Sequence, residues 1–225
     1  MRIGSRIGKR LGVVLAAGSA ALALVGVAGA DQYQVRLTAA GNAAARAAVV
    51  ARSDLGSSAA WTGVSKKPDL SSSPICAGFD PKESDLVIVG AAETDWKHPG
   101  LEFDSVAEVL QAAKMVQLDW QRVMLSPKLL PCLRKTVPQG LGARGKLVAA
   151  RELAVPQLAT YAKAFEIVVD VKSGSQTVRI MIDMLFVARG RTEITLTTAA
   201  AFAARSIVQP AEIRLARALV ARARV

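Results

Sequence analysis

Hydrophobic and polar residues alternate along residues 147–198, and this alternation predicts four consecutive strands. In the clearest run, Phe165 and Ile167 fall on one face while Glu166 falls on the other. The short link Ser173–Ser175 contains Gly174 and separates this run from the next, as expected between antiparallel neighbours. The next run gathers a second set of apolar residues on one face: Val178, Ile180, Ile182, Met184 and Phe186.

The remaining segments predict two further strands and several helices around this block. Short apolar runs indicate strands over 85–94 and 101–110. Helical spacing of apolar residues is found over 37–52, 111–124, a short segment from 126 and 210–224. In the last helix Pro210 suits the first helical position and Glu212 the first turn. The predicted fold class is α+β: a twisted antiparallel sheet of about six strands packed by N-terminal, central and C-terminal helices.

The N-terminal segment has the pattern of a secretory signal peptide. Four basic residues precede an uncharged run over 11–30. The run ends in Ala28-Gly29-Ala30, followed by Asp31, and small residues three and one positions before a cut favour cleavage. We therefore expect a signal peptide at 1–30 and a single exported domain at 31–225. The alternative is that residues 11–30 remain as a membrane anchor, since the run is about as long as a bilayer span.

Charge and location together limit the expected partners. The whole chain carries a formal charge of +11, and loss of residues 1–30, with their four basic residues, leaves +7. An exported basic protein meets anionic lipid, cell-wall polymer or envelope proteins, so we expect no nucleic acid partner. Membrane contact is expected only through an uncleaved signal segment or anionic lipid. The expected location is secreted or in the cell envelope.

The two cysteines, Cys76 and Cys132, are the number needed for one disulfide in an oxidising compartment. Cys76 lies in a Ser-, Pro- and Lys-rich stretch, part of a predicted flexible loop at about 65–82. Neither cysteine belongs to a CxxC pair, so the spacing does not indicate a zinc site. We expect a structural disulfide between them.

No segment of the sequence predicts a catalytic, cofactor-binding or metal-ligating residue. The glycines of the stretch 140–146 match phosphate-binding patterns, but a helix is predicted before them and a strand after them, the reverse of such a loop. His98 is the sole histidine and lies in a predicted surface loop. Eight carboxylates between 80 and 108 leave open an acid–base pair across the first hairpin.

Asp183 is the residue of the strand block that most needs an explanation. It interrupts the apolar run over 180–187, so a covered face would require it to be paired. Arg179 lies on the same face two side chains earlier along the strand. We expect a structural Asp183–Arg179 ion pair.

Several short segments resemble the extracellular sensor-like domain of the mycobacterial serine/threonine kinase H group and its small exported actinobacterial relatives. The segments are Asp54-Leu55 followed by Trp61, Pro74–Cys76, Pro81–Leu86, Ser105–Val109 and Cys132-Leu133. This resemblance covers most of residues 38–220. It implies a twisted antiparallel sheet packed by helices and a cleft for an envelope ligand. This chain departs from those kinases in having no kinase domain and fewer cysteines.

The expected function is that of a non-enzymatic, sensor-like domain that binds an unknown ligand or protein of the bacterial envelope. Two alternatives remain open at this point. One is a structural or adaptor protein of the envelope without a small ligand. The other is a carboxylate-dependent hydrolase.

Overall fold

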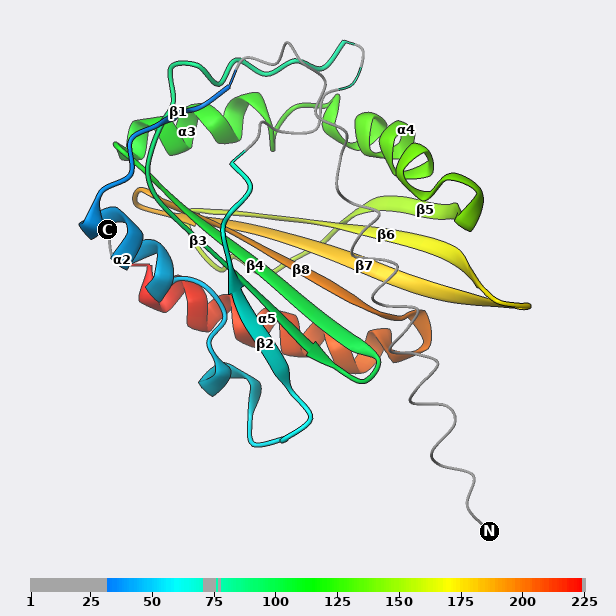
Figure 1. Ribbon diagram of the computed structural model, residues 1–225. Helices are drawn as coiled ribbons and strands as arrows, with labels where there is room; N and C mark the ends of the chain where they lie inside the picture. Colours follow the sequence, from blue (N-terminus) through cyan, green and yellow to red (C-terminus); the bar gives the residue numbers. More distant parts are fainter. Residues whose placement is uncertain (1–31, 71–75, 77, 224–225) are drawn as a thin grey trace.

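The alternating segments form the centre of an eight-stranded, mostly antiparallel twisted sheet in the computed structural model, which describes residues 32–70, 76 and 78–223 (Figure 1). The strands are β1 (Gln34–Val35), β2 (Thr62–Lys66), β3 (Val87–His98), β4 (Leu101–Leu110), β5 (Gly145–Leu153), β6 (Tyr161–Ser173), β7 (Gln176–Arg189) and β8 (Thr192–Ala201). Their order is β1-β3-β4-β8-β7-β6-β5, and β2 pairs with β3 on the same edge as β1. The α+β fold class is confirmed.

The sheet has two strands more than the six predicted. β1 has two residues and pairs in parallel with β3, and β2 pairs antiparallel with β3. Every residue of β1 and β2 is exposed. Neither strand could be predicted from apolar alternation, because backbone pairing with β3 and not burial of a face holds them in the sheet.

Helices cover both faces of the sheet, as Figure 1 shows. They are α2 (Ala39–Ala47), α3 (Ala113–Arg122), α4 (Leu129–Leu141) and α5 (Arg205–Arg222). Ile180 and Ile182 of β7 pack with α4, whereas Leu185 and Val187 pack with α2 and α5. The predicted separation of the two faces of this strand is therefore confirmed, and each face is covered by its own pair of helices, α3 with α4 and α2 with α5.

Several helix boundaries differ from the prediction: α2 ends at Ala47 and not at residue 52, and α4 begins at Leu129 and not at 126. Two further differences involve a proline inside a helix. α4 continues through Pro138 to Leu141, where a loop was expected. α5 begins at Arg205 instead of Pro210, so Glu212 lies in the middle of the helix and not in its first turn. The carbonyls that lose a hydrogen bond belong to the residues four positions earlier, Arg134 and Ser206, which are both exposed. Water can satisfy them, so the helices continue.

Contact between two glycine backbones brings α2 against β3. A Cβ added at Gly41 would overlap the Val89 carbonyl, and one added at Gly90 would overlap Gly41. The pairing of β3 with β4 shifts register at this point, and the amide of Ala91 donates to Asn42 Oδ1 at 3.1 Å. The missing side chains allow a close approach that no other residue type would permit.

Arg222, the last residue of α5, binds the segment that follows α2 through hydrogen bonds. Arg222 donates to both carboxylate oxygens of Asp54, each at 2.8 Å. It also donates to the carbonyls of Ala47 at 2.6 Å and Val49 at 3.0 Å. One guanidinium therefore joins two elements that are far apart in the sequence but lie on the same face of the sheet.

Candidate functional site

A row of polar side chains crosses four adjacent strands on the sheet face that α5 covers. Backbone pairing places Arg151 of β5 opposite Glu166 of β6, Glu166 opposite Asp183 of β7, and Asp183 opposite Thr198 of β8. Glu166, Asp183 and Thr198 are all buried. Because directly opposed residues lie on the same face of a sheet, the register alone brings these four side chains together.

α5 adds three polar side chains above this row. Arg205, Gln209 and Glu212 are spaced by four and three residues, so they lie along one face of the helix. Arg205 Nε lies 2.7 Å from Glu166 Oε2, and Gln209 Nε2 donates to Asp183 Oδ2 at 2.9 Å. The helix and the sheet are thus connected by polar contacts where an apolar interface would be expected.

A pocket of about 530 Å³ lies beside these groups, between α5 and strands β5 to β7. Its apolar walls come from both layers: Leu153, Val155, Pro156, Ala164, Leu185, Pro210 and Ile213. Its polar lining consists of Asp183, Glu212, Arg205, Gln209 and Ser206. An apolar cavity with a few convergent polar groups is the usual form of a small-molecule site.

The three carboxyl groups of the site are held in different ways. Arg151 Nε donates to Glu166 Oε1 at 2.8 Å, so Glu166 has a guanidinium on each of its two oxygens, Arg151 and Arg205. Burial raises the pKa of Glu212 to about 8, and the charge of Asp183 adds to this rise. The pKa of Asp183 is also raised by burial and by Glu166, while its hydrogen bond with Gln209 opposes the rise.

Asp183 and Glu212 both line the pocket, and the charge of Asp183 contributes to the raised pKa of Glu212. Two ionised carboxylates repel each other, so this buried pair is most stable when one of them carries a proton. With a pKa of about 8, Glu212 holds that proton at neutral pH. The site therefore contains one buried proton beside a carboxylate, at the wall of a cavity.

The expected Asp183–Arg179 ion pair is wrong. Arg179 donates to Asp170 at 2.8 Å and 3.0 Å, because β6 and β7 place these two residues directly opposite each other. Four residues along a strand separate Arg179 from Asp183, which is about 13 Å and beyond the reach of an ion pair. The partners of Asp183 come from the helix instead.

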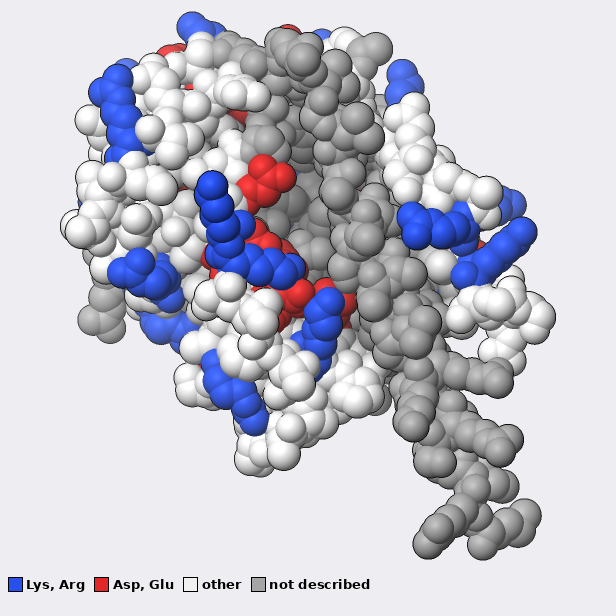
Figure 2. Space-filling model, viewed as in Figure 1, with Lys and Arg blue, Asp and Glu red and all other residues white. Residues whose placement is uncertain are grey.

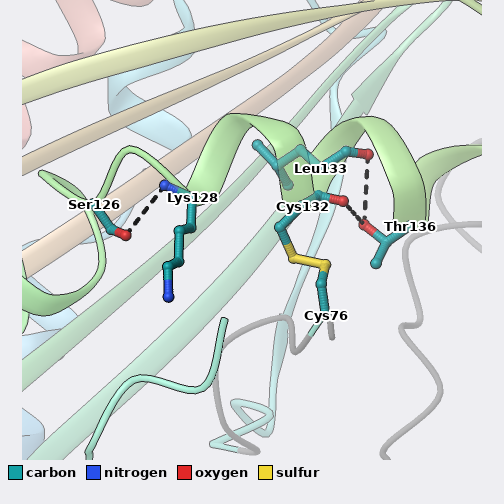
Figure 3. Close-up of a disulfide and its surroundings, with 6 residues drawn as sticks. All are labelled: Cys76, Ser126, Lys128, Cys132, Leu133 and Thr136. Atoms are coloured by element: carbon teal, nitrogen blue, oxygen red, sulfur yellow. Dashed lines mark hydrogen bonds between the residues drawn. A yellow bond between two sulfur atoms is a disulfide. The ribbon is translucent and has the colours of Figure 1, made fainter. Parts of the chain in front are cut away.

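The expected cysteine pair is present on the opposite face of the sheet. Cys76 and Cys132 form a disulfide with their Cα atoms 5.5 Å apart, as Figure 3 shows. Cys132 lies in α4, where the Thr136 hydroxyl donates to its carbonyl at 3.2 Å, and Phe79 packs beside it. The bridge attaches the segment before β3 to α4, away from the pocket. The expected cleavage residues Ala28, Ala30 and Asp31 lie outside the described residues.

The hairpin carboxylates form an ion-pair network on that opposite face. Asp95 and Asp104 face each other across β3 and β4, and Lys66 Nζ lies 2.9 Å from the first and 3.6 Å from the second. Lys97 Nζ lies 3.4 Å from Asp95 and 3.2 Å from Glu102. Figure 2 shows acidic side chains gathered on the molecular surface, bordered by lysine and arginine. The two lysines offset part of this negative charge, and burial together with the charges of Glu93 and Asp95 raises the pKa of Asp104 to about 6.

A second group of acids lies deeper, beneath α3. Tyr33 donates from its hydroxyl to Asp119 Oδ1 at 2.9 Å. Burial raises the pKa of Asp119 to about 6 and that of Glu108 to about 7, and it also raises the pKa of Glu193. In the part of the chain that the structure describes, no group of three His, Cys, Asp or Glu side chains has the geometry to hold a metal ion.

His98 and the glycine-rich stretch 140–146, the other candidates from the sequence, lie away from the pocket. His98 lies at the end of β3, with its ring 5.0 Å from that of Trp61. Trp61 in turn stacks on Phe103 at 5.6 Å. The glycine-rich stretch 140–146 runs from the end of α4 into β5, the predicted helix-to-strand order. Within the described ranges, none of the helices has the length and apolar character needed to span a bilayer.

Six residues of the site were not identified from the sequence: Arg151, Glu166, Thr198, Arg205, Gln209 and Glu212. The spacing of Arg205, Gln209 and Glu212 was a usable signal, because a polar stripe on a helix that must cover an apolar sheet needs partners on that sheet. Because the helix was predicted to begin at Pro210, Arg205 and Gln209 lay outside it, and the polar stripe could not be recognised.

Comparisons with known proteins identify no family for this chain. No family model matches it, and no curated protein matches it. Among solved structures it is similar to the Rv0999 ortholog, an uncharacterized protein of Mycobacterium smegmatis, with 12% identity and a TM-score of 0.44 over 82% of this chain and 98% of that one. It is also similar to PA94, a protein of unknown function from Pseudomonas aeruginosa, with 13% identity and a TM-score of 0.28 over 59% and 78%.

Proposed function

We propose that this protein is an exported component of the bacterial envelope that binds a small ligand in the pocket between α5 and strands β5 to β7. The observation that carries this proposal is the combination of a cavity of about 530 Å³ with apolar walls and convergent buried polar groups. The volume falls within the range usual for small-molecule sites. The protein holds its ligand without converting it, as a sensor-like domain does.

The chemistry of the walls supports a ligand with an apolar body. Leu153 is the last residue of β5, Val155 lies in the segment that follows it, and Ile213 lines the pocket from α5. Each apolar side chain that leaves water on binding contributes roughly 25 cal/mol per Å² of buried surface. A ligand that fills this space would therefore be held mainly by apolar contact and oriented by the polar groups.

The N-terminal pattern and the cysteines support an envelope location. A basic segment, an apolar run and small residues before Asp31 are typical of an exported precursor. The Cys76–Cys132 disulfide would form readily in an oxidising compartment. The resemblance of several segments to a mycobacterial kinase sensor domain agrees with a role in binding an envelope ligand.

One observation favours a hydrolase as a second candidate. A protonated Glu212 beside an ionised Asp183 is an arrangement that general acid–base catalysis uses. Such an enzyme would lose its turnover in Glu212→Gln while still binding its substrate. We favour a binding protein because the pocket has mainly apolar walls and Gln209 holds the Asp183 carboxyl in place through a hydrogen bond.

Binding can be tested with N-phenylnaphthylamine, an uncharged fluorescent probe that brightens in apolar sites. Ser206 and Ile207 are adjacent exposed residues of α5, but only Ser206 lines the pocket. Ser206→Trp would fill the entrance, whereas Ile207→Trp adds the same side chain outside it. We expect saturable probe binding to the wild type and Ile207→Trp and a loss of at least tenfold in affinity for Ser206→Trp.

Two results would contradict the proposed function. Absence of saturable binding to the wild type would show that the pocket does not take an apolar molecule. Equal binding by Ser206→Trp and Ile207→Trp would place the probe elsewhere on the surface. Either result would favour an adaptor that recognises another envelope protein.

A further inference from the structure

Two buried oxygens of the pocket receive no hydrogen bond from the part of the chain that the structure describes. Asp183 is 2% exposed and Glu212 is 5% exposed, and both residues line the cavity. Asp183 Oδ1 and Glu212 Oε1 are shielded from solvent, and neither atom has a hydrogen-bond partner among the described residues. A buried acceptor without a donor is costly, so a ligand that supplies donors here would gain affinity.

The arginines of the site are already engaged. Arg151 and Arg205 both contact Glu166, at 2.6 Å and 2.7 Å. Glu166 and the Asp183–Glu212 pair, which shares one proton, carry two negative charges against the two positive charges of the arginines. The cluster therefore has no net charge. A ligand can bind favourably at the place between Asp183 and Glu212 that the proton now occupies.

We propose that the ligand is an amphiphilic organic cation whose protonated amine binds between Asp183 and Glu212 and whose apolar body packs against Leu153, Val155 and Ile213. This inference rests on the proposed function and names the chemical class of its ligand. An ammonium group supplies three donors and one positive charge. It therefore satisfies both free oxygens and takes over the neutralising role of the shared proton.

Binding exchanges one proton for one cation. The ammonium group keeps its protons, Glu212 loses its proton to solvent, and both carboxyls become ionised beside the new positive charge. The other charged groups that face the pair are Glu166 from β6, Arg151 from β5 and Arg205 from α5, and they remain paired with one another. The Thr198 hydroxyl from β8 does not titrate in this range. Affinity should therefore rise with pH until Glu212 ionises in the free protein.

The test uses octylammonium, octanol and octanoate below micellar concentrations, each competing with N-phenylnaphthylamine at pH 5.5 and pH 8. We expect octylammonium to bind at least tenfold more tightly at pH 8 than at pH 5.5. Octanol should show no such change, and octanoate should be the weakest competitor. Calorimetry in two buffers of different ionisation enthalpy at pH 6.5 should show release of about one proton with octylammonium.

Glu212→Gln removes the titrating group and should abolish the pH dependence of octylammonium binding while leaving octanol binding within twofold. The matched control is Glu152→Gln, which changes a carboxylate of β5 whose side chain is 55% exposed and paired with Lys163 at 3.2 Å. This control should behave as the wild type. The proton count on the unmodified protein keeps the test decisive if Glu212→Gln does not fold.

The inference is overturned if octanol or octanoate competes as well as octylammonium, or if octylammonium binds without proton release. If Ser206→Trp still excludes the neutral probe, those results would not contradict the proposed function of the pocket. Failure of every probe to bind would instead overturn the pocket function itself and the inference with it.

Discussion

The buried carboxyl groups of Asp183 of β7 and Glu212 of α5 come together between the sheet and its covering helix, at the wall of a cavity, and the charge of Asp183 raises the pKa of Glu212. Such a contact needs one proton between two groups that would both be ionised in water at neutral pH. The interface between α5 and the sheet therefore depends on protonation, and occupation of the pocket should depend on it as well.

Glu212→Gln should change how the free energy of unfolding depends on pH. The pKa of Glu212 is about 8 in the folded protein, above its usual value near 4.5, so between these values the folded state holds a proton that the unfolded state has released. The contribution of Glu212 to the free energy of unfolding is therefore largest at low pH. It falls as pH rises towards 8, by at most about 1.4 kcal/mol per pH unit. Urea unfolding at pH 5, 6, 7 and 8 measures it.

The variant should lose less stability than the wild type between pH 5 and pH 8. Raised pKa values of Glu108 and Asp119 on the other face contribute in the same direction, so the variant keeps part of the slope. Glu152→Gln is again the matched control and should follow the wild-type curve. Parallel curves for the wild type and Glu212→Gln would show that Glu212 ionises normally.

Gly41→Ala should destabilise the protein although alanine is the better helix former. In an exposed helical position this change would stabilise by about 1 kcal/mol. Here the new Cβ would overlap the Val89 carbonyl, and overpacking of this kind costs roughly 1–3 kcal/mol. Thermal and urea unfolding measure the sign. The reverse change at an exposed position of the same helix, Ala43→Gly, should cost no more than about 1 kcal/mol. A more stable Gly41→Ala would contradict the close packing of α2 on β3.

Arg222→Lys should lose most of what Arg222→Ala loses. The guanidinium makes two hydrogen bonds to Asp54 and two to backbone carbonyls, a geometry that an ammonium cannot reproduce. We expect a loss of about 2 kcal/mol in the free energy of unfolding for Arg222→Ala. The exposed Arg214 on the same helix is the control and should cost less than about 0.5 kcal/mol when changed to alanine. Full rescue by lysine would show that charge alone matters.

Loss of the disulfide should destabilise the protein without altering the pocket. Cys76 and Cys132 are separated by 56 positions, and closing a loop of this size contributes about 4 kcal/mol in the chain-entropy model. The double variant with both cysteines changed to serine should unfold at lower urea concentration. Its affinity for N-phenylnaphthylamine should stay within twofold of the wild type, because the bridge and the pocket lie on opposite faces of the sheet. A large loss of affinity would indicate that the two faces are coupled.

Most of the six longer strands could be predicted because they bury residues on a helix-covered face, which leaves a period of two in the sequence, whereas β5 buries only Ala150. β1 and β2 carry no such signal, since they bury neither face. Alternation also placed Glu166 on the other face of its strand from Ile167, and Asp183 on the other face from Ile182, as the structure confirms. What it could not supply was the register, which decides that these two carboxylates are neighbours.

The part of the site that lies on α5 could not be predicted because of one proline. Pro210 normally marks a helix start, and that rule removed Arg205 and Gln209 from the predicted helix. The exposed Ser206 carbonyl tolerates the missing donor, so the helix begins earlier. No local rule predicts this, because it depends on which side of the helix faces solvent after packing.

Titration of the Glu212 side-chain carboxyl by carbon-13 NMR shows whether a buried proton lies beside Asp183 and whether a cationic ligand displaces it. In the free protein the resonance should titrate near pH 8, and saturating octylammonium should move the midpoint down by at least one pH unit. The exposed carboxyl of Glu152 serves as the control for a non-specific effect of octylammonium. A Glu212 midpoint near 4.5, or one that octylammonium leaves unchanged, would contradict the account of a buried proton that a cationic ligand replaces.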